Sequence, residues 1–150
     1  MHLKLHHFSH IRPMRAEDIP AVLAIEKQVS LVPWTKEVLT HHLPQYTIVD
    51  TIGKVVLGYA VMSVHPGYSH IKLIGVLPEE QGQGIGTDLL RACIQRSVDS
   101  GNTKIELEVS TENLVAIALY KKHGFKVQDI LANYYSAGKG NRHAYLMVKE

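Results

Sequence analysis

The chain has 150 residues, which is enough for one domain with a substantial hydrophobic core. Hydrophobic residues make up 45% of it and charged residues 20%, as in an ordinary globular protein, and a formal charge of +2 at pH 7 is too small to indicate a nucleic-acid partner. No apolar run reaches the length of a membrane span, no signal peptide is recognisable, and a single cysteine excludes an internal disulfide framework. We therefore expect a cytoplasmic protein without membrane association.

Four of the ten histidines lie in the first ten residues, at His2, His6, His7 and His10. We interpret residues 1–10 as a flexible tail, native or added, and residues 11–150 as the folded domain. The adjacent His41 and His42 point different ways on a helix, so the sequence predicts no bound metal.

The first half of the chain alternates short apolar runs with turn residues. We expect a strand, two helices and three strands there, at residues 11–14, 17–29, 35–42, 46–51, 55–64 and 69–76. Thr35 caps the second helix and Pro44 ends it. The three strands are joined by short links around Gly53 and Pro66-Gly67, which indicates an antiparallel meander.

The second half continues with helices and strands in alternation. We expect a helix to about residue 100, a strand, another helix and two closing strands, at residues 104–109, 113–123, 125–131 and 143–148. The order β-α-α-β-β-β-α-β-α-β-β predicts a single α/β (α+β) domain, with a mixed, mostly antiparallel sheet flanked by helices.

A glycine-rich turn lies where the strand ending at Val76 gives way to a helix. Gly82, Gly84 and Gly86 remove side chains there, so backbone N–H groups at the helix start can point at a phosphate or pyrophosphate. A P-loop is excluded because no lysine follows Gly86. A dinucleotide site would need glycine at position 87, which is Thr87. A helix start with permissive glycines and no ligand stays open as an alternative.

Two motifs in this order resemble those of the GNAT superfamily of N-acetyltransferases. Gln81 to Gly86 is similar to its acyl-CoA loop, [QR]-x-x-G-x-[GA], and Asn113 to Phe125 resembles its N-x-x-A-x-x-L-Y-x-x-x-G-F block. The resemblance covers about residues 11–148 and implies the GNAT fold with acetyl-CoA as cosubstrate. The cofactor-binding residues that it implies are Ile74, Val76, Gln81, Gly82, Gln83, Gly84, Ile85, Gly86, Thr87 and Asn113.

Two carboxylates, Glu106 and Glu108, share one face of the strand at 104–109 because strand side chains alternate. Acyl transfer to an amine needs a group that accepts a proton from the ammonium and one that returns a proton to the thiolate. By resemblance to the family, Glu108 matches the general base, directly or through a water, and Tyr120 the general acid. Solvated strand acids and an aromatic that only packs are the alternatives.

Other residues have a structural alternative as well. Asn113 either contacts the pantetheine arm or caps its helix. Cys93 lies on an apolar helix face, which favours a buried structural thiol over a nucleophile, so we expect direct transfer in a ternary complex.

The segments expected to bind the acceptor resemble those of the RimI-type N-acetyltransferases, which acetylate the N-terminal alanine of a ribosomal protein. The likeness rests on Pro33-Trp34-Thr35, on residues 107–109 and on Asn133-Tyr134-Tyr135 with Ala144 and Met147. It implies that Trp34, Tyr134 and Tyr135 border the acceptor site, although each could serve packing alone. The chain departs from the family at Ser110, Glu112 and His143, which leaves the acceptor open.

The leading hypothesis is thus an acetyltransferase that acts on a protein N-terminus. A small amine or antibiotic is the alternative acceptor, and an acyl-CoA sensor without turnover is the alternative class. The oligomeric state, a monomer or a weak dimer, cannot be read from the sequence.

Overall fold

The computed structural model describes residues 9–135 and 142–150. Its seven strands form one sheet in the order β1-β2-β3-β4-β5-β7-β6. The strands are β1 (His10–Pro13), β2 (Tyr46–Ile52), β3 (Val55–His65), β4 (Tyr68–Val76), β5 (Lys104–Ser110), β6 (Lys126–Tyr135) and β7 (Arg142–Lys149). The helices are α1 (Ile19–Val29), α2 (Lys36–His42), α3 (Ile85–Asp99) and α4 (Leu114–Lys122). The order expected from the sequence is confirmed.

Most boundaries lie within one residue of the expected ones, and the start of β1, the start of α1 and the end of β6 have consequences for the fold. β1 begins at His10, which the sequence had placed in the tail; residues 1–8 lie outside the described residues. α1 begins at Ile19, two residues late, because the Asp18 carboxylate accepts the Arg15 N–H and the Arg12 guanidinium and holds residues 16–18 in a 3₁₀ turn. β6 continues to Tyr135 rather than ending at residue 131.

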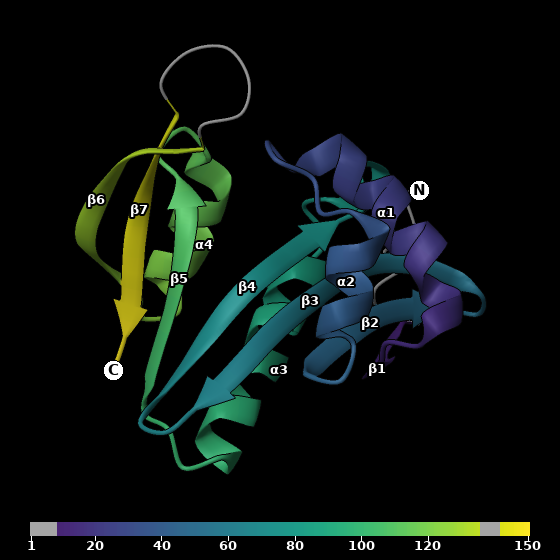
Figure 1. The fold of residues 1–150 in the computed structure, drawn as a ribbon, viewed down its shortest axis with the longest axis horizontal. Coiled ribbons are helices and arrows are strands. Elements are labelled where there is room, and N and C mark those ends of the chain that lie inside the picture. The colour runs from purple at the N-terminus through teal and green to yellow at the C-terminus, as the bar shows by residue number, and fades with distance from the viewer. Residues whose placement is uncertain (1–8, 136–141) are drawn as a thin grey trace.

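Alternating side chains of the central strands supply two cores on opposite faces of the sheet. Val49, Tyr59 and Val61 pack with α1 and α2, whereas the neighbouring Ile48 and Ala60 belong to the core with α3 and α4. Figure 1 shows α1 and α2 in front of β3 and β4, with α3 behind them. Both faces of the central strands are therefore covered, as an α/β layer architecture requires.

β4 and β5 are the only parallel neighbours among the described strands, and they pair over a short stretch. Residues 68–71 of β4 pair with residues 104–107 of β5, and beyond these β4 continues beside β3 while β5 continues beside β7. Figure 1 shows the two strands leaving a common end and diverging. The divergence opens the sheet between Lys72–Val76 and Glu108–Ser110.

The paired end of these strands is held by a buried polar network. Ser97 of α3 donates to Ser69 of β4 over 2.8 Å, and the Asn102 amide donates to Ser69 and to the His65 carbonyl oxygen. The helix that follows the glycine turn is thereby fixed to the start of β4. In the described part of the chain, no helix is both long and apolar enough to span a membrane.

Candidate active site

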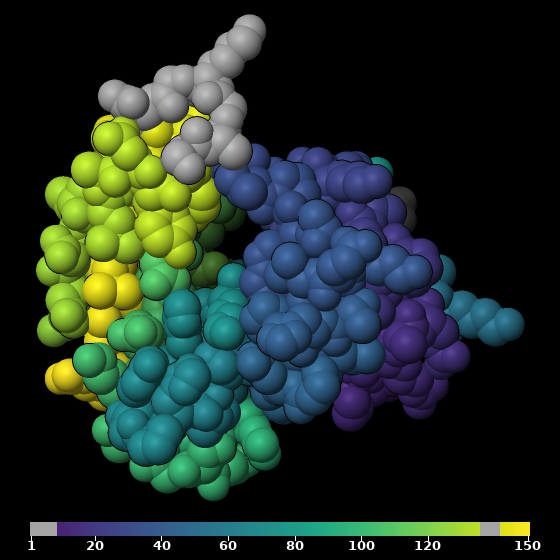
Figure 2. All heavy atoms as spheres, viewed as in Figure 1, coloured from purple at the N-terminus to yellow at the C-terminus, as the bar shows by residue number. Residues whose placement is uncertain are grey.

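The divergence of β4 and β5 opens a cleft of about 610 Å³. Its walls come from the α1–α2 connection, β4, β5, the start of α4 and the end of β6. Figure 2 shows the hollow between the yellow-green strands on one side and the blue helices on the other. Seven of the residues singled out from the sequence line it: Trp34, Ile74, Glu108, Asn113, Tyr120, Tyr134 and Tyr135.

Glu108 is held in the cleft by a histidine that the sequence analysis did not select. His70 of β4 places its Nε2 atom 2.6 Å from Glu108 Oε2. A carboxylate only accepts hydrogen bonds, so His70 Nε2 carries the hydrogen and donates it. The two side chains are 23% and 18% exposed, so the pair is accessible yet largely shielded from bulk water. The expected alternation on β5 is confirmed, since Leu107 and Val109 are buried on the other face.

Tyr120 lies deeper, where α4 packs against the core. The residue is 5% exposed, and its ring lies 5.9 Å from that of Phe125. Burial raises the pKa of the Tyr120 phenol well above its ordinary value. The phenol therefore keeps its proton at any pH at which the protein is assayed, as a proton donor must. Tyr120 thus both packs in the core and lines the cleft, and its catalytic role stays a prediction.

The glycine turn lies at the other end of β4, outside the residues that line the cleft. Gly82 and Gly84 have φ angles of 81° and 94°, in the left-handed region that favours glycine, and Gly84 is the N-cap of α3. The Gln81 amide donates to the Val76 carbonyl oxygen over 3.2 Å, which fixes the turn to the end of β4. The N–H groups of Ile85, Gly86 and Thr87 have no acceptor within their own helix and face outward from its positive end.

Gly86 differs from the other two glycines of the turn. It lies inside α3, and a Cβ there would be 3.6 Å from Leu119 and 3.7 Å from Val76, which is ordinary contact. Neither backbone strain nor crowding requires glycine at this position. The missing side chain instead leaves the helix start open to a ligand, so the turn fits a pyrophosphate.

The cleft wall that carries Trp34 is held in place by a buried carboxylate. Glu26 of α1 is 1% exposed and accepts hydrogen bonds from Tyr59 Oη at 2.8 Å, Ser30 Oγ at 2.5 Å and the Trp34 N–H at 2.9 Å. Gly75 is required for this contact, since a Cβ there would meet the Tyr59 hydroxyl at 2.3 Å. Glu26 thus holds the α1–α2 connection, with Trp34, beside the cleft. No signal in the sequence distinguishes Glu26 from the solvated acids of a helix.

The opposite wall carries the two tyrosines on a bulge of β6. The register with β7 shifts between Leu131 and Tyr135, and Asn133 has a φ of 55°, the one described non-glycine residue with positive φ. The Asn133 N–H donates to His143 Nδ1 over 3.0 Å. The rings of Tyr134 and Tyr135 meet edge to face at 5.0 Å. Residues 136–141, between β6 and β7, lie outside the described residues.

Asn113 has the structural role named as its alternative, that of a helix cap, and Cys93 is the buried structural thiol expected from the sequence. The Asn113 side chain accepts the Ala116 N–H and so caps α4, while the residue also lines the cleft. Cys93 is fully buried, and burial raises the pKa of its thiol to about 12. A thiol that stays protonated is a poor nucleophile, so Cys93 is a core residue.

The diverging parallel strands, the glycine turn at a helix start and the carboxylate in the cleft together define an acyl-CoA-dependent transferase. Residues 12–125 match the acetyltransferase (GNAT) family. The chain is 31% identical over 155 residues to the N-alpha-acetyltransferase of Saccharolobus solfataricus, covering 93% of this chain and 91% of that protein. It is 29% identical over 141 residues to the [ribosomal protein bS18]-alanine N-acetyltransferase of Escherichia coli K12, covering 92% and 95%.

A solved structure gives the same relationship. The ribosomal-protein-S18-alanine N-acetyltransferase from Escherichia coli superposes with a TM-score of 0.86 at 28% identity, over 94% of this chain and 92% of that one. The chain belongs to the GNAT family of acetyltransferases. The fold expected from the sequence, the N-acetyltransferase class and acetyl-CoA as cosubstrate are thereby confirmed at the level of the family.

Proposed function

We propose that this protein transfers the acetyl group of acetyl-CoA to the α-amine of a protein N-terminus whose first residue is small, such as alanine. The observation that carries the proposal is the Glu108–His70 pair inside a cleft that has Tyr120 at its base and aromatic side chains on two walls. The two relatives above act on α-amines by their names, which supports the same acceptor class here.

The cosubstrate would lie along the diverging part of β4. The amides at the start of α3 would hold its pyrophosphate. The peptide groups of residues 73–76, which have β3 on one side and the space left by the diverging β5 on the other, would hydrogen-bond the amides of the pantetheine arm. This orientation brings the thioester toward the point where β4 and β5 separate. The α1–α2 connection and the end of β6 would then border the entry of the peptide.

The proton transfers would use groups of opposite protonation. Glu108 accepts a proton from the α-ammonium, and the neutral amine attacks the thioester carbonyl carbon, so that an N–C bond forms and the C–S bond breaks. Tyr120, whose pKa is raised by burial, gives its proton to the departing thiolate, and the second proton that the nitrogen loses as the amide forms restores the phenol. His70 does not need to touch substrate: by donating to Glu108 it fixes the orientation of that carboxylate. Transfer is direct, because Cys93 is buried and protonated.

Two side chains restrict the acceptor. Trp34 and Tyr134 lie on opposite walls of the cleft, so an extended chain end fits between them while a bulky first side chain does not. We place this reaction in the cytoplasm, where a single buried thiol suits reducing conditions.

The test is release of CoA thiol with a panel of acceptors. An alanyl peptide without lysine should be acetylated, and the same peptide with its N-terminus blocked should not. A bulky first residue should lower kcat/KM. Efficient acetylation of a polyamine or an aminoglycoside without turnover of any peptide would instead support a small-amine acceptor. Binding of acetyl-CoA without turnover of any of them would support a sensor.

A further inference from the structure

One of the residues that line the cleft is a lysine. Lys72 of β4 lies two residues beyond His70, at a bulge where the pairing of β4 with β3 shifts, and its side chain lines the cleft and reaches α2. Its Nζ atom lies 3.3 Å from Nε2 of His42 on α2. The position of the ammonium group is thus set by a second element and not by the flexible lysine chain alone.

The hydrogen bonds of His42 fix its protonation state. Its Nδ1 lies 2.8 Å from the carbonyl oxygen of Val38, which only accepts, so Nδ1 carries the hydrogen. Nε2 then presents its lone pair and accepts from the Lys72 ammonium. His42 is neutral in this arrangement, and the Trp34 ring covers it at a centroid distance of 4.6 Å. The contact orients Lys72 without neutralising its charge.

The cleft therefore holds a separated pair of opposite charges. Among the described residues that line it, Lys72 and Glu108 are the two with formal charges, while His70 is paired with Glu108 and His42 with Lys72. The Cα atoms of His70 and Lys72 are at most about 7 Å apart, since two residues of extended chain span no more than that. An extended acceptor with its α-amine at Glu108 would bring its second or third side chain near Lys72.

We propose that Lys72 is a specificity-determining residue that favours acceptors with aspartate or glutamate at the second or third position and disfavours lysine or arginine there. This inference rests on the proposed function, because it assumes a peptide with its amine at Glu108. Lys72 acts on acceptor binding and not on the chemical step, so its substitution should change KM more than kcat.

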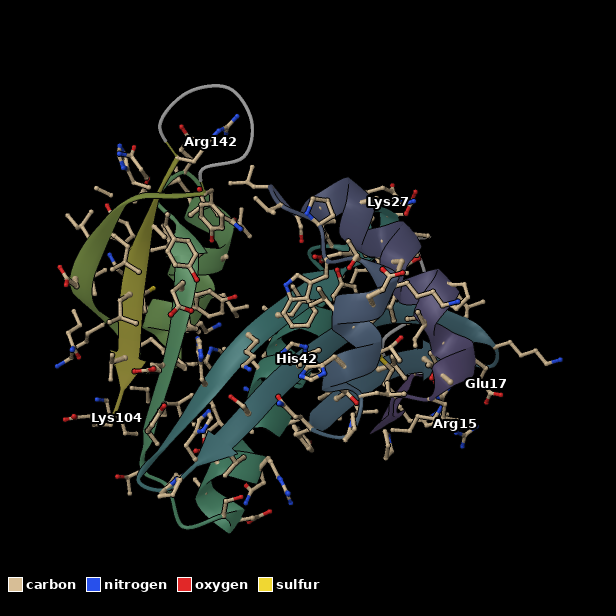
Figure 3. All side chains as sticks on the ribbon, in the orientation of Figure 1. Arg15, Glu17, Lys27, His42, Lys104 and Arg142 are labelled. Carbon is tan, nitrogen blue, oxygen red and sulfur yellow. The ribbon has the colours of Figure 1, made fainter. Side chains whose placement is uncertain are left out.

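The test uses three alanyl peptides that differ only at the second residue: aspartate, asparagine and lysine. The wild-type enzyme should prefer aspartate to asparagine by about 3- to 10-fold in kcat/KM, the effect expected of one partly screened charge pair, and lysine should be the poorest. Lys72→Met should remove the preference, and Lys72→Glu should invert it, and both changes should appear mainly in KM. Lys104→Met is the matched control, since Figure 3 shows Lys104 at the paired end of β5, away from His42.

The outcomes separate this inference from the proposed function. Equal use of the three peptides by the wild type, with Lys72→Glu showing no inversion, would overturn the role of Lys72 and leave N-terminal acetylation standing. Acetylation of none of the three peptides would overturn the proposed function and this inference with it. High salt should shrink the wild-type preference and leave Lys72→Met unaffected, because the interaction is between charges.

Discussion

The two halves of β4 and β5 differ although each strand continues without a break. At one end, residues 68–71 and 104–107 form a parallel ladder, supported by the buried Ser97–Ser69–Asn102 network. At the other end, residues 72–76 and 108–110 diverge, and residues 72–74 and 108–110 line the cleft. The paired half satisfies its peptide groups within the protein, whereas the diverging half leaves peptide groups for a ligand.

Glu106 and Glu108 show what this difference does to chemically identical residues. Both lie on the same face of β5, but Glu106 is opposite His70 in the paired ladder and Glu108 lies just beyond it, lining the cleft. The His70 side chain reaches across to Glu108. The point of separation between the strands, and not the residue type, selects the carboxylate that lines the cleft.

The largest expected effect comes from Glu108→Gln. We expect kcat to fall by about 10² to 10⁴, the usual contribution of a positioned base, with little change in acetyl-CoA affinity. Because an α-amine has a pKa of about 7.7–8.0, the loss should shrink as the pH rises above 8 and the free amine predominates. Glu106→Gln is the matched control and should keep near wild-type turnover. Full activity of Glu108→Gln at every pH would place the base elsewhere.

Tyr120→Phe should come next, with a fall in kcat of about 10² to 10³. Raising the pH should not rescue it, since the thiolate still lacks a proton donor. Burial raises the pKa of the wild-type phenol, so wild-type activity should not decline through loss of this proton up to pH 9. The measurement is the pH profile of kcat for both proteins. Rescue of Tyr120→Phe at high pH would contradict the role of an acid.

The two ends of β4 can be compared through their glycines. Gly84 follows the diverging end and Gly67 precedes the paired end, and both have φ near 90°. Valine at either position should cost about 1–2 kcal/mol in stability, because both require the left-handed region. Gly84→Val should in addition raise the dissociation constant of acetyl-CoA about tenfold or more, whereas Gly67→Val should not. Calorimetric titration of the two variants measures the difference, and equal affinities would argue against pyrophosphate binding at the turn.

Asn102→Ala should affect the paired half alone. Its amide donates to Ser69 and to the His65 carbonyl oxygen, so removing it takes two hydrogen bonds from a largely buried network, at a cost of about 1–3 kcal/mol in the free energy of unfolding. Turnover per folded molecule should stay close to that of the wild type. Denaturant unfolding together with kcat checks this. A large fall in kcat with unchanged stability would show that the two halves are not separable in this way.

The smallest effect is expected for Cys93→Ser. The thiol is buried in the core and its pKa is raised to about 12, so it takes no part in transfer. We expect unchanged kcat and a modest loss of stability from burying a hydroxyl. Incubation with labelled acetyl-CoA in the absence of acceptor should leave the wild-type protein unlabelled. An acetylated enzyme whose label disappears in Cys93→Ser would show a covalent route.

Local rules sufficed for much of the fold. Apolar periodicity placed every helix and strand, the Asn113 cap followed from its position before a helix, and strand alternation put Glu106 and Glu108 on one face. The β6 bulge was missed because asparagine, although it tolerates the left-handed region, does not by itself mark a bulge. Helix α1 began late because the Asp18 contact with Arg12 is tertiary.

The cleft contacts needed information that a sequence does not hold. Glu108 and His70 are 38 residues apart, and Lys72 and His42 are 30 apart. Both contacts depend on where the β4–β5 ladder stops, and no residue in either strand signals that point. The family motifs predicted Glu108 and Tyr120. His70, which contacts Glu108, and Lys72, which adds a positive charge to the cleft, were identified only from the structure.

A crystal structure with CoA joined through an acetyl group to the α-amine of an alanyl peptide tests the central claim most directly. The diverging half of β4 and β5 should hold the whole analogue, with the pyrophosphate on the amides of residues 83–87, the linked nitrogen within hydrogen-bonding reach of Glu108 and the sulfur within reach of Tyr120. The peptide should leave between Trp34 and Tyr134. An analogue bound with its nitrogen away from Glu108, or with its pyrophosphate off the glycine turn, would contradict the account.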